Sequence, residues 1–195
     1  MTSKECIQLI KMDLARFDHN GESRINILTD SSLMITFWLR IGSWLFYKEN
    51  IFAKVALVPV KVIYKFTELL TGIQVPLWTQ IGGGICFRHH SCIIIAGSVV
   101  IGENCTIHQG VTLGKTFAGK KSGVPYLEDH VVVFPGANVI GNVHIGRHAV
   151  IGANAVVLDD VPANCVVAGV PAKVISSDSS KCFDEYWAKT FDFTN

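Results

Sequence analysis

A six-residue period runs through the middle of the chain and constrains its fold more than any other feature. Between Val75 and Ile175 an aliphatic residue recurs every six positions, often followed by glycine, with a small or β-branched residue in the fifth place. Regular examples are IGENCT from Ile101, VIGNVH from Val139 and IGANAV from Ile151. Because a hexad is too short to bury its own apolar side chain, successive coils must stack to form a core.

Stacking of hexads places the aliphatic leaders in one inner column and the fifth residues in a second, while the backbone of each coil pairs with the next. We expect the glycine in second place to lie at a corner, where φ values are needed that a side chain resists. Neither the period nor the content of glycine, valine and isoleucine fits an α-helix. The repeat therefore predicts a solenoid of short strands rather than an ordinary β-sandwich.

The first 73 residues differ in kind and predict an N-terminal α-helical segment, 1–73. Apolar residues recur at helical spacing over 7–17 and 37–45, and the stretch 51–70 has a helical composition, with Pro59 expected as a kink or boundary. Lysines keep the uncharged runs far shorter than a membrane span. Two interpretations of the apolar surface stay open: packing within the segment and on a neighbouring subunit, which is favoured, or a basic amphipathic face in peripheral contact with a membrane.

Composition narrows the functional class. The formal net charge of +1 gives no indication of nucleic-acid binding. The chain starts with a charged amphipathic stretch rather than the apolar core of a signal peptide. Its six cysteines lack CxxC spacing, which favours buried, reduced thiols. We therefore expect a cytoplasmic protein, with the inner face of the membrane as an alternative location.

Two interruptions of the repeat mark its expected functional face, because insertions in a repeat protein gather on the face that binds. Two extra residues lie around Arg88–Cys92. A longer excursion, 115–126, is rich in glycine and lysine and predicts a loop thrown out from one corner. The solenoid is expected to cover 74–176 and to be followed by a polar tail, 177–195.

The hexads, the run HQGVTLG from His108, the loop after it and AGVPAKVI from Ala168 together resemble the hexapeptide-repeat acyltransferases. The chain is most similar to the serine acetyltransferase group, and especially to its short relatives in polysaccharide biosynthesis, over residues 5–176. The resemblance implies a mainly β fold, a left-handed parallel β-helix, whose hand departs from the usual right-handed crossover and does not follow from the period. It also implies acetyl-CoA as donor, and a homotrimer with active sites between subunits.

The resemblance assigns a catalytic base. The family's catalytic histidine lies in an Asp-His-Ala-Thr-Gly run directly before a hexad, and the matching run here is RHHSC from Arg88, so His89 takes the position. A neutral imidazole there can take the proton of an acceptor hydroxyl while the oxygen attacks the thioester. His90 is expected to point elsewhere. A surface histidine at a corner is the alternative interpretation.

Three departures from the family pattern bear on the acceptor. Where serine acetyltransferases carry two aspartates, this chain has Arg88 directly before the histidine and Gln74 fifteen residues upstream of it; where they carry a loop histidine, it has Val124. An amino acid's ammonium needs a carboxylate partner. We therefore expect Arg88 and Gln74 to contact a sugar hydroxyl acceptor, on a polysaccharide or its precursor. Serine O-acetylation, as in cysteine biosynthesis, is the alternative.

Spacing also suggests an acetyl-CoA site. Ala137, Ala155 and Lys173 are 18 residues apart, or three hexads, which predicts one column on one face. Small residues there would let pantetheine lie against the backbone, and Lys173 could meet a CoA phosphate. Gly114, within the run that carries the resemblance, joins this set. Ordinary core packing is the alternative for the two alanines.

A competing class is a metal-dependent, carbonic anhydrase-like trimer or a non-catalytic β-helix subunit. Catalytic zinc needs about three nitrogen ligands and an open position. Five histidines are candidates: His89, His108, His130, His144 and His148. Their irregular spacing does not match a fixed ligand register, so no metal is expected.

Overall fold

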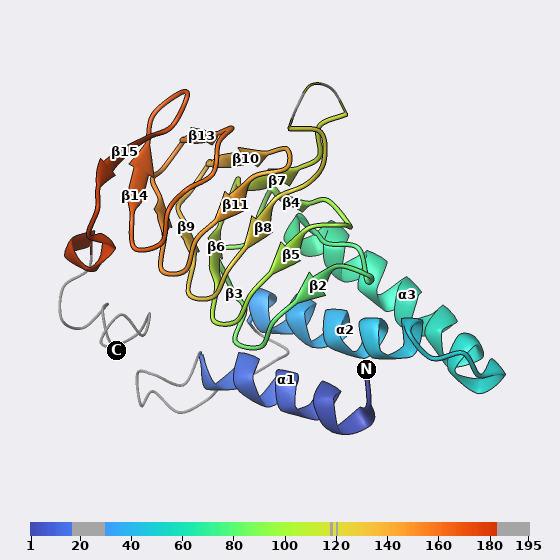
Figure 1. Cartoon of the computed structure of the whole chain (residues 1–195). Helices are drawn as coiled ribbons and strands as arrows, with labels where there is room; N and C mark the ends of the chain where they lie inside the picture. The colour runs from blue at the N-terminus through green and yellow to red at the C-terminus, as the bar shows by residue number, and fades with distance from the viewer. Residues whose placement is uncertain (17–29, 118, 120, 183–195) are drawn as a thin grey trace.

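The computed structural model describes residues 1–16, 30–117, 119 and 121–182. In this part of the chain three helices come first, α1 (Ser3–Ala15), α2 (Ser31–Phe46) and α3 (Ile51–Thr71). Short strands then wind into a solenoid whose coils succeed one another away from the helices (Figure 1). A short 3₁₀ helix, η1 (Ser179–Cys182), follows the last strand.

The strands stack into three sheets around one apolar interior. The first sheet has the order β1 (Ile73–Gln74), β4 (Ile93–Ile95), β7 (Thr112–Gly114), β10 (Asn138–Ile140) and β13 (Val156–Val157). The second has the order β11 (His144–Ile145), β8 (Tyr126–Leu127), β5 (Val100–Ile101) and β2 (Gln80–Ile81). The third has the order β15 (Lys173–Ser176), β14 (Val166–Ala168), β12 (Val150–Ile151), β9 (Val132–Val133), β6 (Thr106–His108) and β3 (Cys86–Arg88).

Pairing between coils follows the hexad count. Val132 in β9 pairs in parallel with Val150 in β12, so a regular coil is 18 residues long. The offset between β1 and β4 is 20 positions, and between β5 and β8 it is 26. The offset of 20 exceeds the regular 18 because this coil contains the insertion around His89. The offset of 26 exceeds it because that coil contains the loop at 115–126. The prediction of a parallel β-helix with an N-terminal helical segment is confirmed.

The two predicted inner columns form the core. Leaders and fifth residues of the hexads are almost completely buried, so their aliphatic groups are removed from water along the whole solenoid. The buried leaders include Ile101, Ile107, Leu127, Val133, Val139, Ile145 and Ile151. The buried fifth residues include Cys105, Val111, Val131, Ala137, Val143, Ala149 and Ala155.

The prediction that glycine in second place is needed for its φ value is wrong. Left-handed φ values fall instead on the fourth residue of the hexad, as at Asn104 (φ 55°) and Gly136 (φ 73°). Glycine is needed in second place because the backbone of the next coil passes too close to leave room for a side chain. A Cβ added to Gly82 would lie 2.6 Å from the amide nitrogen of Glu103, and one added to Gly102 would lie 2.6 Å from the carbonyl carbon of Glu128.

Helix ends follow local capping signals. Thr2 and Glu5 form a reciprocal capping box at the start of α1. The side chains of Asp30 and Asn50 cap α2 and α3 by accepting backbone N–H bonds. Gly72, in the left-handed conformation (φ 69°), ends α3.

Pro59 does not end α3, because the helix runs through it from Ile51 to Thr71. A proline inside a helix removes one N–H bond, here to the carbonyl of Val55 four residues earlier. Val55 is 64% exposed, so this position lies on the outer side of the helix, where water can replace the missing donor.

A buried ion pair fastens α1 and α2 to the first coil. Arg40 Nε donates to Asp13 Oδ2 at 2.8 Å, and the two side chains are only 5% and 4% exposed. The Arg40 guanidinium also donates to the carbonyl groups of Ile81 and Gly82. Asp13 Oδ1 accepts from the N–H of Gly84 at 2.8 Å. With their hydrogen bonds satisfied, these charges fix the helices relative to the solenoid.

Some expectations fall on residues outside the described part of the chain. These are Phe17 in the first helical stretch, Lys120 in the loop, and the tail beyond Cys182.

Candidate active site

His89 lies at a corner of the solenoid, directly after β3. Its side chain is exposed, whereas Phe87, two residues earlier, points inward and is 1% exposed. The helical segment supports this strand, because the Ser32 hydroxyl at the start of α2 donates to the carbonyl of Phe87. His89 is thus held at the rim of a rigid strand and open to solvent, as a base that meets a substrate must be.

The insertion that carries His89 has an unusual backbone. His89, Ser91 and Cys92 all have positive φ, at 54°, 125° and 52°. Non-glycine residues rarely adopt such values, and they gather at functional sites where the surrounding structure holds them. His90, Ser91 and Cys92 are exposed. The two extra residues therefore form a tight bulge that presents His89 at the corner.

The structure brings His108 next to His89, with 6.3 Å between ring centroids. His108 ends β6, and the 20-residue offset pairs it directly with Arg88 on β3. Its ring stacks on Phe134 at 5.2 Å. In the sequence His108 opens the HQGVTLG run and is a zinc candidate, and neither observation places it beside His89. The register across the insertion was the signal that could have done so.

His108 has a buried Nε2 with no hydrogen-bond partner among the described residues. Burial, and after it the nearby Arg88 and His89, lower its pKa from 6.5 to about 4. The imidazole is therefore neutral at pH 7, and its Nε2 is covered by surrounding atoms. Gln109, the next residue, also has a buried side-chain oxygen without a partner in this part of the chain.

We expect His108 to make stability depend on pH. The unfolded chain binds a proton there near pH 6.5 and the folded chain only near pH 4, so its contribution is complete above about 6.5 and is lost as the pH falls toward 4. His108→Phe should reduce the proton uptake on unfolding in this window by up to about one proton. Urea unfolding at stepped pH measures it, with exposed His90→Phe as control. Equal slopes for the wild type and His108→Phe would contradict a buried neutral imidazole.

Gln74, the other predicted acceptor contact, lies on a different strand from the one that leads to His89. It ends β1, is exposed, and pairs in register with Ile94. It lines a groove of about 510 Å³ between α3 and the first coil, together with Lys61 and Lys65. No hydrogen bond joins Gln74 to His89 in the described structure.

The predicted column of cofactor residues is only partly present. Ala137 and Ala155 are in register, but both are 0% exposed and their methyl groups face the interior. Lys173 is not in their column. The last coil is two residues short, with Val150 paired to Val166, and the chain then turns back so that β15 runs antiparallel to β14. The equal spacing of 18 therefore does not bring Lys173 under the two alanines.

Gly114 occupies a close approach between coils. It ends β7, and its carbonyl accepts from the N–H of Gly141 at 3.0 Å. A Cβ there would lie 2.7 Å from Cδ1 of Ile140. Because this atom is the far end of a flexible side chain, packing alone does not require a glycine at this position.

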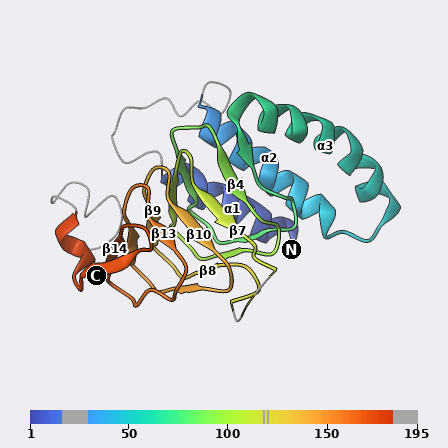
Figure 2. The ribbon, with the colours of Figure 1, turned by 90° about the horizontal axis from the view of Figure 1, so that it is seen from above.

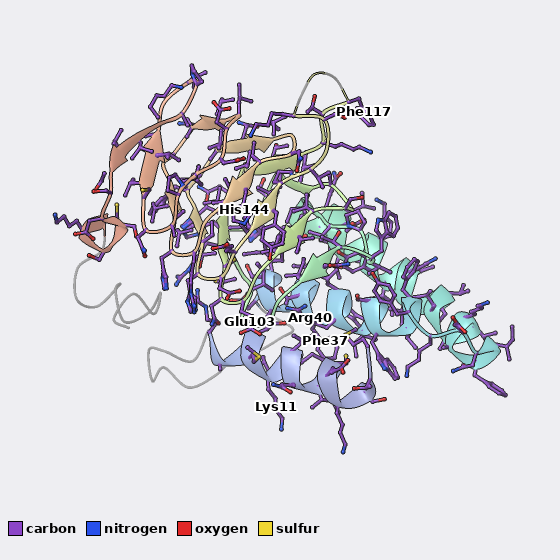
Figure 3. All side chains as sticks on the ribbon, in the orientation of Figure 1. Lys11, Phe37, Arg40, Glu103, Phe117 and His144 are labelled. Carbon is purple, nitrogen blue, oxygen red and sulfur yellow. The ribbon has the colours of Figure 1, made fainter. Side chains whose placement is uncertain are left out.

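The loop at 115–126 stands out from the coil between β7 and β8, with Phe117 on it (Figure 3). Thr116 and Gly123 exchange backbone hydrogen bonds of 3.0 Å at its base. Phe117 is 82% exposed, and Lys121 Nζ lies 3.0 Å from Asp160 Oδ1. The loop is thus tied at its base and presents an apolar side chain to solvent.

The other three histidines considered as zinc ligands contact aromatic rings other than that of His89. His130 and His148 stack at 4.7 Å. His144 stacks on Tyr126 at 5.1 Å, and its Nε2 lies 3.2 Å from Glu128 Oε1. Across residues 1–16, 30–117, 119 and 121–182, no three histidine, cysteine, aspartate or glutamate side chains converge as a metal site would require.

Comparison with known proteins now places the chain in a family. The family described as "Bacterial transferase hexapeptide (six repeats)" matches residues 125–159. A serine acetyltransferase of Staphylococcus xylosus is 32% identical over 180 residues, covering 91% of this chain and 78% of that protein. The chain belongs to the serine acetyltransferase family.

Other members of the serine acetyltransferase family extend the match. One from Synechococcus elongatus is 39% identical over 138 residues, which are 70% of this chain; the chain spans about half (53%) of that protein. A solved serine acetyltransferase in complex with CoA is 26% identical, with a TM-score of 0.73 over 89% of this chain and 71% of that one. The expected acetyltransferase class and the acetyl-CoA donor are confirmed. The expected tie to polysaccharide-biosynthesis relatives finds no support in these proteins.

Proposed function

We propose that this serine acetyltransferase-family protein moves the acetyl group of acetyl-CoA to a hydroxyl, with His89 as general base. The observation that carries the proposal is the exposed His89, held on a bulge of residues with positive φ beside the half-buried, neutral His108. His89 takes the hydroxyl proton as the oxygen bonds to the thioester carbonyl carbon. The C–S bond then breaks, and the sulfur of CoA leaves with the proton returned by His89.

We further propose a binding role for Lys173 toward the acetyl-CoA donor. Lys173 is exposed and can meet a CoA phosphate as a point charge. Ala137, Ala155 and Gly114 act only through the backbone they shape, because the alanines face inward. We also propose a homotrimer with sites between subunits, as the family resemblance implies.

L-Serine is the first candidate acceptor, and the names of the relatives support it. A saccharide hydroxyl is the second, favoured by one observation. The charge of Arg88 acts on this site, since it helps to lower the pKa of His108. A positive field beside the base opposes an acceptor's ammonium group and suits a neutral or anionic acceptor.

The two candidates can be separated by the acceptor's ammonium group. We expect the ratio of kcat/KM for L-serine to that for 3-hydroxypropionate, which lacks only the ammonium, to rise roughly tenfold in Arg88→Asp, or about 1.4 kcal/mol. Release of free CoA measures it. Arg147→Asp, an exposed arginine after β11, is the matched control.

The outcomes differ for the two acceptors. A wild-type enzyme that strongly prefers L-serine, with a ratio that Arg88→Asp leaves unchanged, would remove the argument for a saccharide. A wild type that turns over oligosaccharides or nucleotide sugars but not L-serine would remove serine. Failure to release CoA with any hydroxyl acceptor would overturn the proposed transfer itself.

A further inference from the structure

Helix α3 carries an apolar stripe on its outer face, which we call the α3 stripe. Its members recur three or four positions apart, so they share one side of the helix. They are Phe52, Val55, Val58, Val62, Phe66 and Leu69, each between 60% and 84% exposed. Contiguous apolar surface of this kind marks an interaction site, unlike single exposed side chains, which are common on any protein.

The opposite side of α3 is firmly packed. Leu57 and Tyr64 are buried, and the Tyr64 hydroxyl donates to the carbonyl of Val75 at 2.6 Å. Figure 2 shows α3 as the outermost element of the helical end, with α2 between it and the coil. The orientation of α3 is therefore set by its inner face, and the α3 stripe is held outward.

A row of lysines accompanies the α3 stripe. Lys54, Lys61 and Lys65 are all exposed, and at 100° per residue they lie together along one flank of the stripe. The acidic residue of α3 is Glu68, and it is already 2.9 Å from Lys65. The helix thus presents apolar side chains in its middle and positive charge along one border.

We propose that the α3 stripe docks on an anionic lipid surface, with α3 lying flat at the boundary between headgroups and acyl chains. The apolar side chains would enter the acyl region, and the lysines would reach lipid phosphates on flexible stems. Among the described residues, no helix combines the length and the apolar character needed to cross a bilayer. A helix in the plane of the surface uses both features of α3 at once.

Charge selects this occupant over a second copy of the chain. An apolar stripe alone fits either one. A contact between two α3 helices would bring two lysine rows close together, with only Glu68 on each helix to balance them. A surface of anionic lipid neutralises every lysine in the row.

Vesicle binding by the full chain tests this. Extruded vesicles of phosphatidylcholine with one quarter phosphatidylglycerol are pelleted with the protein at about 0.1 M and 0.5 M salt, against pure phosphatidylcholine. We expect binding to the anionic vesicles that weakens with salt. Phe52→Ser with Phe66→Ser, and separately Lys54→Gln with Lys61→Gln, should each weaken it roughly tenfold or more.

The matched control variants remove the same kinds of side chain, apolar or lysine, at exposed positions outside α3. Phe117→Ser with Ile175→Ser removes two other exposed apolar side chains, and Lys4→Gln with Lys11→Gln removes two exposed lysines of α1. These variants should bind as the wild type does, and thermal melting checks the fold of all four. Equal losses in controls and α3 variants, or no binding by the wild type, would overturn the proposal. So would a lower sedimentation mass in Phe52→Ser with Phe66→Ser while vesicle binding stays intact, which would assign the stripe to a contact between copies.

Discussion

Replacement of His89 by alanine is expected to lower kcat by roughly 10²–10⁴-fold, the range for loss of a positioned proton acceptor. The KM for acetyl-CoA should stay nearly unchanged. The side chain is exposed at the end of β3 and supports no part of the core, so its removal takes away the base without opening a cavity. Release of free CoA at saturating acceptor measures kcat, and thermal melting confirms that the fold is intact.

His90 provides the control for that experiment. It is the same residue type, one position later on the same exposed bulge. His90→Ala should retain most of the wild-type kcat, because its imidazole has no contact with His108 corresponding to the 6.3 Å approach of His89. If both variants lost the same fraction of activity and also bound acetyl-CoA less tightly, the bulge would have a structural role and His89 would not be the base.

Among the changes proposed in this chain, loss of the Asp13 carboxylate is expected to lower the free energy of unfolding most. Asp13→Asn leaves Arg40 charged, buried and without its counter-ion, and breaking such a pair costs about 3–5 kcal/mol. The loss should appear as a lower urea midpoint without loss of the solenoid's far-ultraviolet signal at low urea. Because Asp13 also accepts from the N–H of Gly84, the first coil should lose its attachment to α1 first.

Two comparisons make the stability result specific. Lys121→Gln breaks the exposed pair with Asp160 and should cost no more than about 1 kcal/mol. Replacing both members of the buried pair, Asp13→Leu with Arg40→Met, should cost less than the sum of the single changes, because no unpaired charge stays buried. A single-variant loss as small as that of Lys121→Gln would show that water reaches Arg40 in the folded chain.

The bulge that carries His89 and the buried ion pair belong to the same first coil. Arg40 bonds to the carbonyl of Ile81 in β2, and β3, which leads to His89, begins at Cys86. In a solenoid each coil depends mainly on its neighbours, so local loosening need not unfold the far end. Asp13→Asn should therefore affect the site more than an equally destabilising change near β12 would.

The repeat and the N-terminal helices follow from the sequence alone, and the family resemblance predicts that His89 is the base. The repeat and the helices depend on short-range chemistry. A hexad's pattern of aliphatic and small residues recurs within one coil, and Asn50 and Gly72 cap α3 by contacts within a few residues. The insertion around His89 was visible because it breaks a period that is otherwise regular.

Contacts between residues of different coils become visible only in the folded chain. His108 reaches His89 because β3 and β6 pair at an offset that includes the insertion. Lys173 leaves the predicted column because the last coil is two residues short and the chain reverses after it. Asp13 and Arg40 meet because α1 and α2 both pack on the first coil. The hexad pattern predicts a regular offset of 18 residues, but it does not show how an insertion, a short last coil or a chain reversal shifts the pairing of residues distant in sequence.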